Sequence, residues 1–237
     1  MNIYHLSREW AHKKGIALYD EQTLPSTNDW AKAQAFQTPS DTALYLTEHQ
    51  TQGRGRYERT WCEQGEGKFF LGTWSFRVPF PPSPVVTARI GLNVVKAFHK
   101  SFPALSWSLK APNDVFLTGQ KVCGILTETV SQGDKHRLLI GLGINVLGAP
   151  EKVKEAIALN AWLPAFNEGD WLRLLDQLKE NLEELVPLAH MNELQSEERS
   201  QILHWLNQNP NLKYQYSSVD QDGSLLYEDR KIDWSEL

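Results

Sequence analysis

The chain has 237 residues, of which 41% are hydrophobic and 22% are charged. These fractions are typical of a soluble globular protein and exclude disorder, collagen and coiled coil as the main architecture. At about 150 residues per domain, the length predicts one or two domains. With 24 Lys and Arg against 29 Asp and Glu, the net charge of −5 disfavours a dedicated nucleic-acid binder.

Neither a secreted nor a membrane protein is expected. The first ten residues lack the apolar region of a secretory signal. The longest apolar stretch, Leu138–Pro150, is too short for a membrane helix, which needs about 20 residues. The two cysteines, Cys62 and Cys123, could form one disulfide, but a reducing compartment is the simpler interpretation, so the cytoplasm is expected.

Helix and strand signals alternate through the first half of the chain. Ser26-Thr27-Asn28 is a strong N-cap cluster, and the residues through Phe36 suit an amphipathic helix. Residues 2–18 have mixed polarity and no clear cap, so no element is assigned there. The other elements of this half are predicted strands over Thr42–Glu48 and Phe69–Val78 and a predicted helix over Val85–Lys100.

The second half contains short strands, then helices, then a β tail. The strands are predicted over Leu105–Leu109, Asp114–Leu117, Lys121–Val130 and Arg137–Ile144, with turns at Gly119-Gln120 and Gln132-Gly133-Asp134. The helices are predicted over Glu151–Leu163, Asp170–Leu185 and Glu193–Asn207, and the tail begins near Leu212. These patterns predict an α+β fold in which helices pack against a mixed, mostly antiparallel sheet.

The segment QTQGRGRYERTW, residues 50–61, suits an anionic ligand. Its glycines let the backbone approach a ligand closely, and Arg56 and Arg59 offer planar donors for phosphate or carboxylate. Trp61 could stack on a base or cover an apolar ligand. The alternatives are a solvated loop whose arginines pair with nearby glutamates, or a contact to nucleic acid.

Three further segments are weak on their own. KAPND at 110–114 gathers polar side chains in a turn, and KVCGILTE at 121–128 opens an apolar strand with a lysine. GLGIN at 141–145 ends a hydrophobic strand with two glycines and an amide. Each also has an ordinary structural interpretation, as a turn, a surface lysine or a strand end.

Taken together and in this order, STN at 26–28 and the four segments resemble the catalytic domain of biotin protein ligases over about residues 23–146. The pattern G-R-G-R-x-x-R-x-W, followed by K-x-P-N-D and K-x-x-G-I-L-x-E, is highly specific for that family. The resemblance implies a fold related to class II aminoacyl-tRNA synthetases. It also implies a catalytic domain over 1–210 and a short, reduced SH3-like β element over 211–237.

The resemblance implies an activity in two steps. Members of the family activate biotin with ATP and Mg²⁺ to biotinyl-5′-AMP and pyrophosphate. The ε-amine of a lysine on a biotin carboxyl carrier protein, such as that of acetyl-CoA carboxylase, then attacks the mixed anhydride. This chemistry needs no enzyme nucleophile, but it needs neutralisation of charge and exclusion of water. No metal ligands of the chain itself are assigned, and a monomer or a homodimer is expected.

The same resemblance assigns candidate site residues. Biotin would be bound by Ser26, Thr27, Asn28, Gln50, Gly53, Arg54, Gly55, Arg56, Lys121 and Gly124. ATP would be bound by Arg56, Arg59, Trp61, Lys110, Asn113 and Asn145. The catalytic set is Lys121, Arg56, Arg59 and Asp114, with Lys121 on the reacting carboxyl and α-phosphate and Asp114 orienting or deprotonating the carrier lysine.

The chain departs from the family pattern at three places. Ala111 stands where the family usually has Trp, a space that Trp107 or Trp74 could fill. Glu58 replaces a glycine, and Glu63-Gln64 replace Ser-Pro. Only 25 residues precede Ser26, too few for the winged helix-turn-helix of repressor-type members, so no DNA binding is expected.

Three alternatives remain open from the sequence. One is a catalytically weak or inactive homologue that binds biotin or a nucleotide, which the departures at Ala111 and Glu58 suggest. The second is a ligase for lipoate on the same fold. The third is an RNA-binding module that uses the arginine segment.

Overall fold

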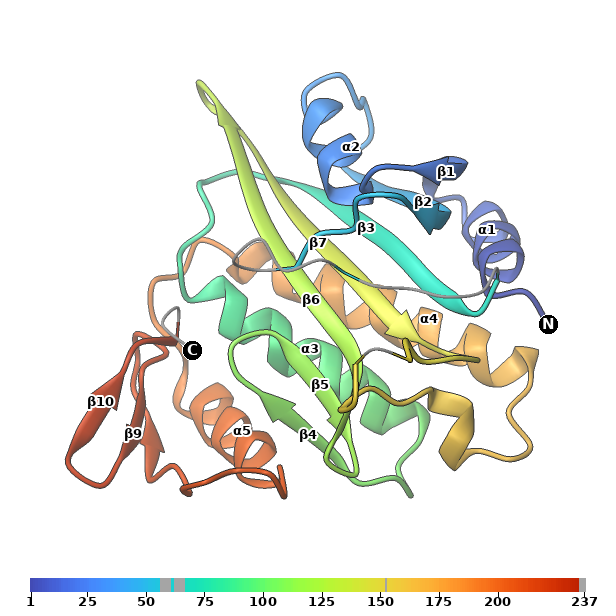
Figure 1. The fold of residues 1–237 in the computed structure, drawn as a ribbon. Helices are drawn as coiled ribbons and strands as arrows, with labels where there is room; N and C mark the ends of the chain where they lie inside the picture. Colours follow the sequence, from blue (N-terminus) through green and yellow to red (C-terminus); the bar gives the residue numbers. More distant parts are fainter. Residues whose placement is uncertain (56–60, 62–66, 152, 235–237) are drawn as a thin grey trace. The chain divides into compact units, whose positions relative to one another are not determined.

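The computed structural model describes residues 1–55, 61, 67–151 and 153–234, and the chain divides into two compact units (Figure 1). Unit 1 comprises Met1–Pro81 and Val122–Leu172. Unit 2 comprises Pro82–Lys121 and Arg173–Leu237. Both units are therefore assembled from segments that are distant in the sequence.

The centre of unit 1 is a sheet of five strands. In spatial order they are β1 (Ala17–Leu24), β2 (Thr42–Gln50), β3 (Phe69–Val78), β7 (Lys135–Asn145) and β6 (Gln120–Gln132), the last from Val122 onward (Figure 1). β1 and β2 are parallel, and the other neighbouring strands are antiparallel. The predicted mixed, mostly antiparallel sheet is confirmed.

A helix covers each face of this sheet. On one face, Tyr45 packs with Ala31 of α2 (Thr27–Ala33). On the other face, the ring of Trp74 lies 6.0 Å from that of Trp10 in α1 (Ile3–Lys13). Because successive side chains of a strand point to opposite faces, β3 is buried along its whole length except at Arg77.

The first 24 residues contain two elements that the sequence did not reveal. Helix α1 begins after Asn2, whose side-chain oxygen accepts the backbone N–H of His5 at 3.0 Å. Asn is an effective N-cap, so a signal for this helix was present in the sequence. Strand β1 is exposed or half-buried except at Leu24, so it lacks the apolar alternation by which a strand is recognised.

Unit 2 is built mainly from helices. Its elements are α3 (Val86–Ser101), the hairpin β4 (Trp107–Lys110) and β5 (Asp114–Leu117), α4 (Glu168–Leu185) from Arg173 onward, η3 (Val186–Leu188) and α5 (Ser196–Asn207). The predicted apolar face of α3 is confirmed, since Ile90, Val94 and Phe98 are fully buried. The ring of Phe98 lies 4.9 Å from that of Trp107, which joins α3 to the hairpin.

The C-terminal part of unit 2 is a small antiparallel sheet. It contains β8 (Ser218–Val219), β9 (Leu225–Tyr227) and β10 (Arg230–Ile232). Gly223, with φ +84°, supplies the left-handed conformation between β8 and β9. The predicted short C-terminal β element is therefore present.

The helix expected over Glu151–Leu163 is wrong. The described residues there form turns, and only the short η2 (Leu159–Trp162) is helical. The backbone N–H of Asn160 donates instead to the carbonyl of Val146, 3.1 Å away. Helix propensity contributes only tenths of a kcal/mol per residue, and prolines at 150 and 164 limit the helix to a length that packing must stabilise.

In the described part of the chain, no helix has both the length and the apolar character needed to cross a membrane.

A buried ion pair holds α3 to α5 inside unit 2. Arg89 has no exposed surface, and its Nε lies 2.6 Å from Oε1 of Glu198. The guanidinium also donates to the carbonyls of Leu188 and Glu193, each at 2.8 Å. A buried cation with these partners makes Glu198 essential to unit 2, because removing it leaves a charge without compensation.

We therefore expect Glu198→Ala to lower the free energy of unfolding by about 3 kcal/mol, measured by urea denaturation. The matched control is Glu197→Ala, on the exposed side of the same helix turn, which should change it by less than about 0.5 kcal/mol. Equal effects of the two substitutions would contradict this account of Arg89.

Candidate functional site

The junction between β1 and α2 gathers the first candidate residues. Ser26 is the N-cap of α2, with its hydroxyl 3.4 Å from the backbone N–H of Asp29. The backbone N–H of Thr27 donates to Oε1 of Gln50 at 2.8 Å. Ser26, Thr27 and Asn28 are all buried, so the structure brings these three and Gln50 together, as the sequence predicts for a polar, uncharged site.

Thr73 belongs to this group and was missed from the sequence. Its hydroxyl, fully buried on β3, lies 2.6 Å from Oδ1 of Asn28 and 2.9 Å from the hydroxyl of Thr27. A polar residue in an otherwise apolar strand, FFLGTWSFRV, was the available signal. Burial without a partner would be costly for that hydroxyl, so Asn28 and Thr27 stabilise Thr73 as well as being oriented by it.

The two glycines of GLGIN create room for two candidate residues. A Cβ on Gly141 would lie 2.0 Å from Oδ1 of Asn28, and a Cβ on Gly143 would lie 2.6 Å from the ring of Trp61. Real Cβ atoms do not approach other atoms so closely. Asn28 and Trp61 can therefore lie against β7 only because both positions lack a side chain.

The glycine-rich segment is attached to the sheet at both described ends. The backbone N–H groups of Thr51 and Gln52 each donate at 2.9 Å, to the carbonyls of Leu24 and Pro25. The carbonyl of Gly53 accepts the N–H of Trp61 at 2.8 Å. Gly53 and Trp61 are therefore joined directly through their backbones. Arg56 and Arg59, which the sequence predicts as anion-binding residues, and Cys62 lie outside the described residues.

Arg54 is held by carboxylates on two different elements. Its Nε donates to Oδ2 of Asp29 at 3.0 Å, its Nη2 contacts Oδ1 of the same carboxylate, and Nη2 also lies 3.2 Å from Oε2 of Glu128. Burial acts to lower the pKa of Arg54, but these carboxylates outweigh it and raise the pKa above its ordinary value. The side chain therefore remains charged and paired.

Glu128 is the acidic centre of this cluster. Burial alone would raise the pKa of its carboxyl, but the hydrogen bond from Asn28 and the positive charges of Arg54 and Lys32 outweigh burial and hold the pKa below its usual value. Nδ2 of Asn28 donates to Oε2 of Glu128 at 3.0 Å. The ionised form is thus the one that the folded chain favours.

Lys121 and Asp114 belong to unit 2, where they form an ion pair. The Lys121 ammonium lies 2.7 Å from Oδ1 of Asp114, and both side chains are largely buried. Lys110 lies over the ring of Phe116, 5.2 Å from its centre, and Asn113 is half-buried in the turn between β4 and β5. The structure therefore joins the two candidate catalytic residues of this unit.

The remaining candidates lie on the unit 1 sheet. Gly55 continues the glycine-rich segment after Arg54, and Gly124 is paired with Gly143 between β6 and β7. Asn145 is buried at the end of β7, opposite Phe69.

Neither tryptophan suggested to compensate for Ala111 is available for that purpose. Trp107 is buried against Phe98, and its indole N–H donates to the carbonyl of Phe102 at 3.0 Å. Trp74 is buried between Trp10 and a neighbouring ring of β3. Instead, the indole of Trp234, near the C-terminus, donates to the carbonyl of Pro112 at 2.9 Å and thus packs on the KAPND turn.

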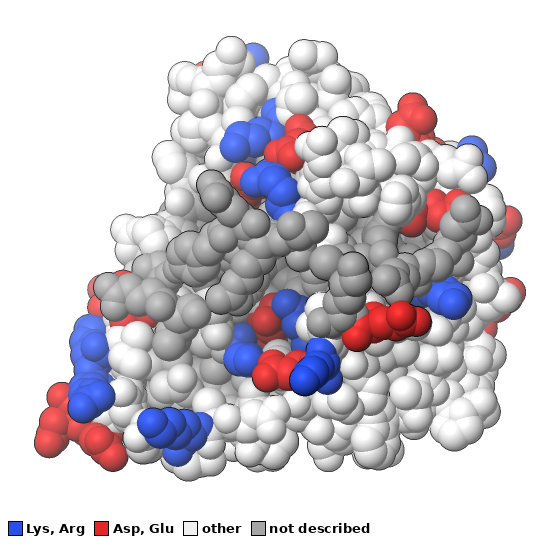
Figure 2. All heavy atoms as spheres, in the orientation of Figure 1, with Lys and Arg blue, Asp and Glu red and all other residues white. Residues whose placement is uncertain are grey.

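Described side chains of both signs occur together on the face of the molecule drawn in Figure 2. On the face drawn in Figure 2, the described Lys and Arg side chains lie in small groups beside Asp and Glu side chains. Nucleic-acid binders gather positive charge along one face or helix. The arrangement therefore gives no support to the RNA-binding alternative.

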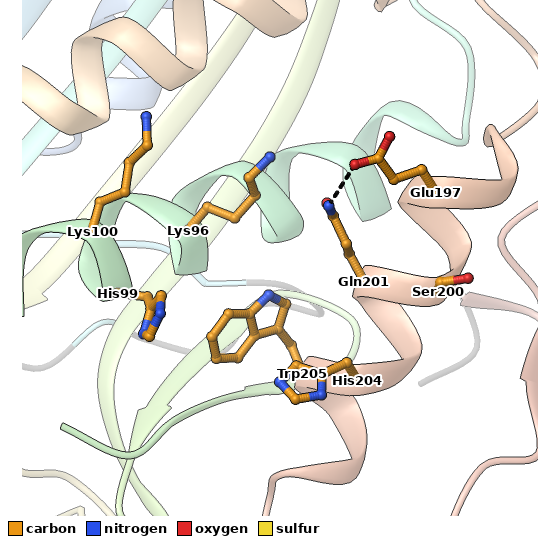
Figure 3. A pocket seen from close by; sticks show the side chains of 8 residues that line it. All are labelled: Lys96, His99, Lys100, Glu197, Ser200, Gln201, His204 and Trp205. Carbon is orange, nitrogen blue, oxygen red and sulfur yellow. Dashed lines mark hydrogen bonds between the residues drawn. The ribbon is translucent and has the colours of Figure 1, made fainter. Parts of the chain in front are cut away.

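A pocket of about 390 Å³ in unit 2 lies apart from the candidate residues (Figure 3). It is lined by Lys96, His99 and Lys100 of α3 and by Glu197, Ser200, Gln201, His204 and Trp205 of α5. The rings of His99 and Trp205 are 5.1 Å apart. None of the residues predicted to bind or react lines this pocket, so it is not part of the candidate site.

The described residues contain no group of three or more His, Cys, Asp or Glu side chains arranged to hold a metal ion. Mg²⁺ prefers phosphate oxygens and water to an all-protein cage.

Solved structures with similar folds are biotin protein ligases. The enzyme from Aquifex aeolicus in complex with biotin and ATP superposes with a TM-score of 0.68 at 24% identity, covering 91% of this chain and 95% of that one. The enzyme from Leishmania major with biotinyl-5-AMP gives 0.62 at 19% identity, covering 88% and 93%. At these identities the similarity shows that the fold is that of biotin protein ligases.

The sequence itself matches the model of the biotin/lipoate A/B protein ligase family over residues 20–145, just over half of the chain. The chain belongs to this family. All of the candidate site residues, from Ser26 to Asn145, lie inside the matched range.

Curated relatives match over different lengths. The bifunctional ligase/repressor BirA of Bacillus subtilis is 31% identical over 138 residues, which cover 57% of this chain and 42% of the relative. The biotin--[acetyl-CoA-carboxylase] ligase of Mycobacterium tuberculosis is 28% identical over 203 residues, which cover 82% and 67%. The chain thus spans less than half of the BirA protein.

We expect Gly141→Ala to displace Asn28 and lower the free energy of unfolding by about 1–3 kcal/mol, because the new methyl group overlaps the amide. Gly91→Ala is the control, since a Cβ there meets only Leu109, at 3.9 Å, and alanine favours the helix. Urea denaturation measures both. A neutral Gly141→Ala would contradict the close approach of Asn28 to β7.

The lowered pKa of Glu128 predicts a pH dependence of stability. A carboxyl with a depressed pKa in the folded state stabilises the fold above its unfolded pKa, near 4.5, and this contribution is lost as the pH falls through the folded pKa. Between about pH 5 and pH 3, the free energy of unfolding should therefore fall more steeply for the natural chain than for Glu128→Gln. Glu9→Gln, on the exposed side of α1, should keep the steeper slope.

Proposed function

We propose that the protein is an ATP-dependent biotin protein ligase. The observation that carries the proposal is the uncharged hydrogen-bonding group of the buried Thr27, Asn28 and Thr73 and the half-buried Gln50, beside the glycine-rich segment in a chain of this family. A ureido ring is uncharged and both donates and accepts hydrogen bonds, so it requires partners of this kind. The relatives named as biotin ligases support the same conclusion.

The reaction joins two anions, which determines what the chain must supply. An oxygen of the biotin carboxylate attacks the α-phosphorus of ATP, and the bond to pyrophosphate, the leaving group, breaks. A Mg²⁺ ion bound with the nucleotide would supply further neutralisation of charge. Lys121, Arg56 and Arg59 would neutralise the charge that collects on the carboxyl and α-phosphate. Trp61, Lys110, Asn113 and Asn145 would bind the nucleotide, while Gly53, Gly55 and Gly124 let the backbone approach biotin closely.

In the second step, the ε-amine of a carrier lysine attacks the carbonyl carbon of the adenylate, and AMP leaves. The ion pair with Asp114 holds the Lys121 ammonium in one position. We therefore assign Asp114 the role of orienting Lys121 and also the incoming amine. Proximity supplies most of the acceleration of such a step, because the anhydride is already reactive.

The wider setting belongs to the same proposal. The acceptor would be the biotin carboxyl carrier protein of acetyl-CoA carboxylase, as the names of two relatives suggest. The catalytic domain would comprise residues 1–210 and the β element 211–237, in a cytoplasmic monomer or homodimer.

A lipoate ligase is the second candidate, because the family model that matches covers both biotin and lipoate ligases. Isothermal titration separates the two acids. Binding of biotin and not of lipoate is expected, since a dithiolane ring cannot use the amide and hydroxyl partners at Thr27, Asn28 and Gln50.

Lys121→Ala should lower the rate of biotin-dependent pyrophosphate release by about a hundredfold or more, because it removes a cation from the reacting carboxyl and phosphate. Lys100→Ala, on the exposed face of α3 that lines the pocket of Figure 3, should leave the rate unchanged.

Pyrophosphate release by the natural chain tests the proposed function itself. Absence of pyrophosphate release on mixing it with biotin and Mg·ATP would favour the inactive homologue suggested by Ala111 and Glu58. An unchanged rate in Lys121→Ala would refute the role of Lys121 instead.

A further inference from the structure

The side chain of Arg54 is turned toward the body of unit 1. Two of its nitrogens contact the carboxylate of Asp29 on α2, and Nη2 also reaches Glu128 on β6 at 3.2 Å. Three segments that are far apart in the sequence therefore meet at one guanidinium. A planar guanidinium that faces a carboxylate with two donors holds it in a defined orientation.

Glu128 connects this contact to the candidate binding residues. Its Oε2 accepts Nδ2 of Asn28 at 3.0 Å, and Nδ2 also lies 3.3 Å from the carbonyl of Leu126. The other end of the Asn28 amide, Oδ1, lies 2.6 Å from the hydroxyl of Thr73. The nitrogen of the amide thus faces two acceptors and its oxygen faces a hydroxyl donor, which excludes the orientation with nitrogen and oxygen exchanged. Glu128 and Thr73 together therefore fix the orientation of the Asn28 amide.

The charges of the cluster balance. Arg54 and Lys32 supply two cations, and Asp29 and Glu128 supply two anions, with Lys32 Nζ 3.5 Å from Oε1 of Glu128. Single exposed ion pairs contribute little to stability. Here the pair contacts Asn28, which is only 3% exposed, so it affects the orientation of a buried amide in addition to stability.

We propose that Arg54, Asp29 and Glu128 form a clasp that positions Asn28 and the start of the glycine-rich segment, and thereby sets the affinity for the uncharged ring of the acid substrate. This inference rests on the proposed function. The three are positioning residues, because Arg54 is already paired with two carboxylates and leaves the neutralisation of the reacting anions to other cations. Asp29 lies in none of the segments that identify the family.

The experiment compares Glu128→Gln and Arg54→Gln with the natural chain in steady-state pyrophosphate release. We expect the KM for biotin to rise about fivefold to tenfold while kcat and the KM for ATP stay within about twofold, as for a lost orientation worth roughly one charge-assisted hydrogen bond. Glu128→Asp, which keeps the charge, should recover part of the affinity. A fall in kcat at unchanged KM, or no change in either, would overturn the clasp.

Asp41→Asn and Arg77→Gln are the matched controls. Asp41 and Arg77 form another ion pair of unit 1, with Nε 3.3 Å from Oδ1, and neither contacts the candidate residues. Both variants should behave like the natural chain. If they raise the KM for biotin as much as Glu128→Gln does, the loss of any surface ion pair has this effect, and the clasp is refuted.

A second measurement does not depend on activity. In the ligand-free protein, the side-chain amide resonances of Asn28 should shift in Glu128→Gln and in Arg54→Gln but not in Arg77→Gln. Unchanged resonances would refute the clasp even in an active enzyme. A third outcome is that the shifts occur but the natural chain binds no biotin. The proposed function and the effect on biotin affinity would then be refuted, whereas the positioning of Asn28 by the clasp would be supported.

Discussion

The hydrogen bond between Thr73 and Asn28 is the interaction on which the rest of the site depends. It joins the centre of the unit 1 sheet to the first turn of α2, and it exists only because Gly141 leaves space for the amide. With Asn28 fixed, its other end orders Glu128, which in turn holds Arg54. A buried network of this kind is stable only when every member has a partner, so its parts depend on one another.

The chemistry divides between recognition and charge. Under the proposed function, the described candidates of unit 1 would bind an uncharged ring through hydroxyl and amide groups, and Arg54, the one described arginine of the segment, is paired with Asp29 and Glu128. In unit 2, the ammonium of Lys121 forms an ion pair with Asp114. A ligase that joins a vitamin acid to a nucleotide needs both properties, because a charged recognition site would bind the wrong acids and a neutral reaction site would not stabilise the transition state.

Much of the fold could be predicted from the sequence where the pattern was strong. β3 and β5 have the predicted limits, because each is a mostly apolar run that a proline or a turn ends. Over 151–158 prediction failed, since favourable helix propensity was outweighed by the backbone hydrogen bonds of a short loop. Motif spacing identified the candidates. It did not identify the roles of Thr73 and Asp29, because these roles depend on contacts with residues 45 and 25 positions away, although the polar side chain of Thr73 in an apolar strand was a signal that the position is unusual.

The parallel pairing of β1 with β2 has a consequence for how the site evolves. β1 and β2 run in the same direction, and Leu24 at the end of β1 is opposite Gln50 at the end of β2. The segment that leads to Ser26 and the segment that leads to Gly53 therefore leave the sheet at the same end. Loops at the carboxyl ends of parallel strands can vary while the strands stay in register. A single-residue insertion in either strand would shift Thr27 past Gln50 and reverse the faces of the side chains beyond it. Changes in the length of β1 or β2 would therefore disrupt the contact between Thr27 and Gln50.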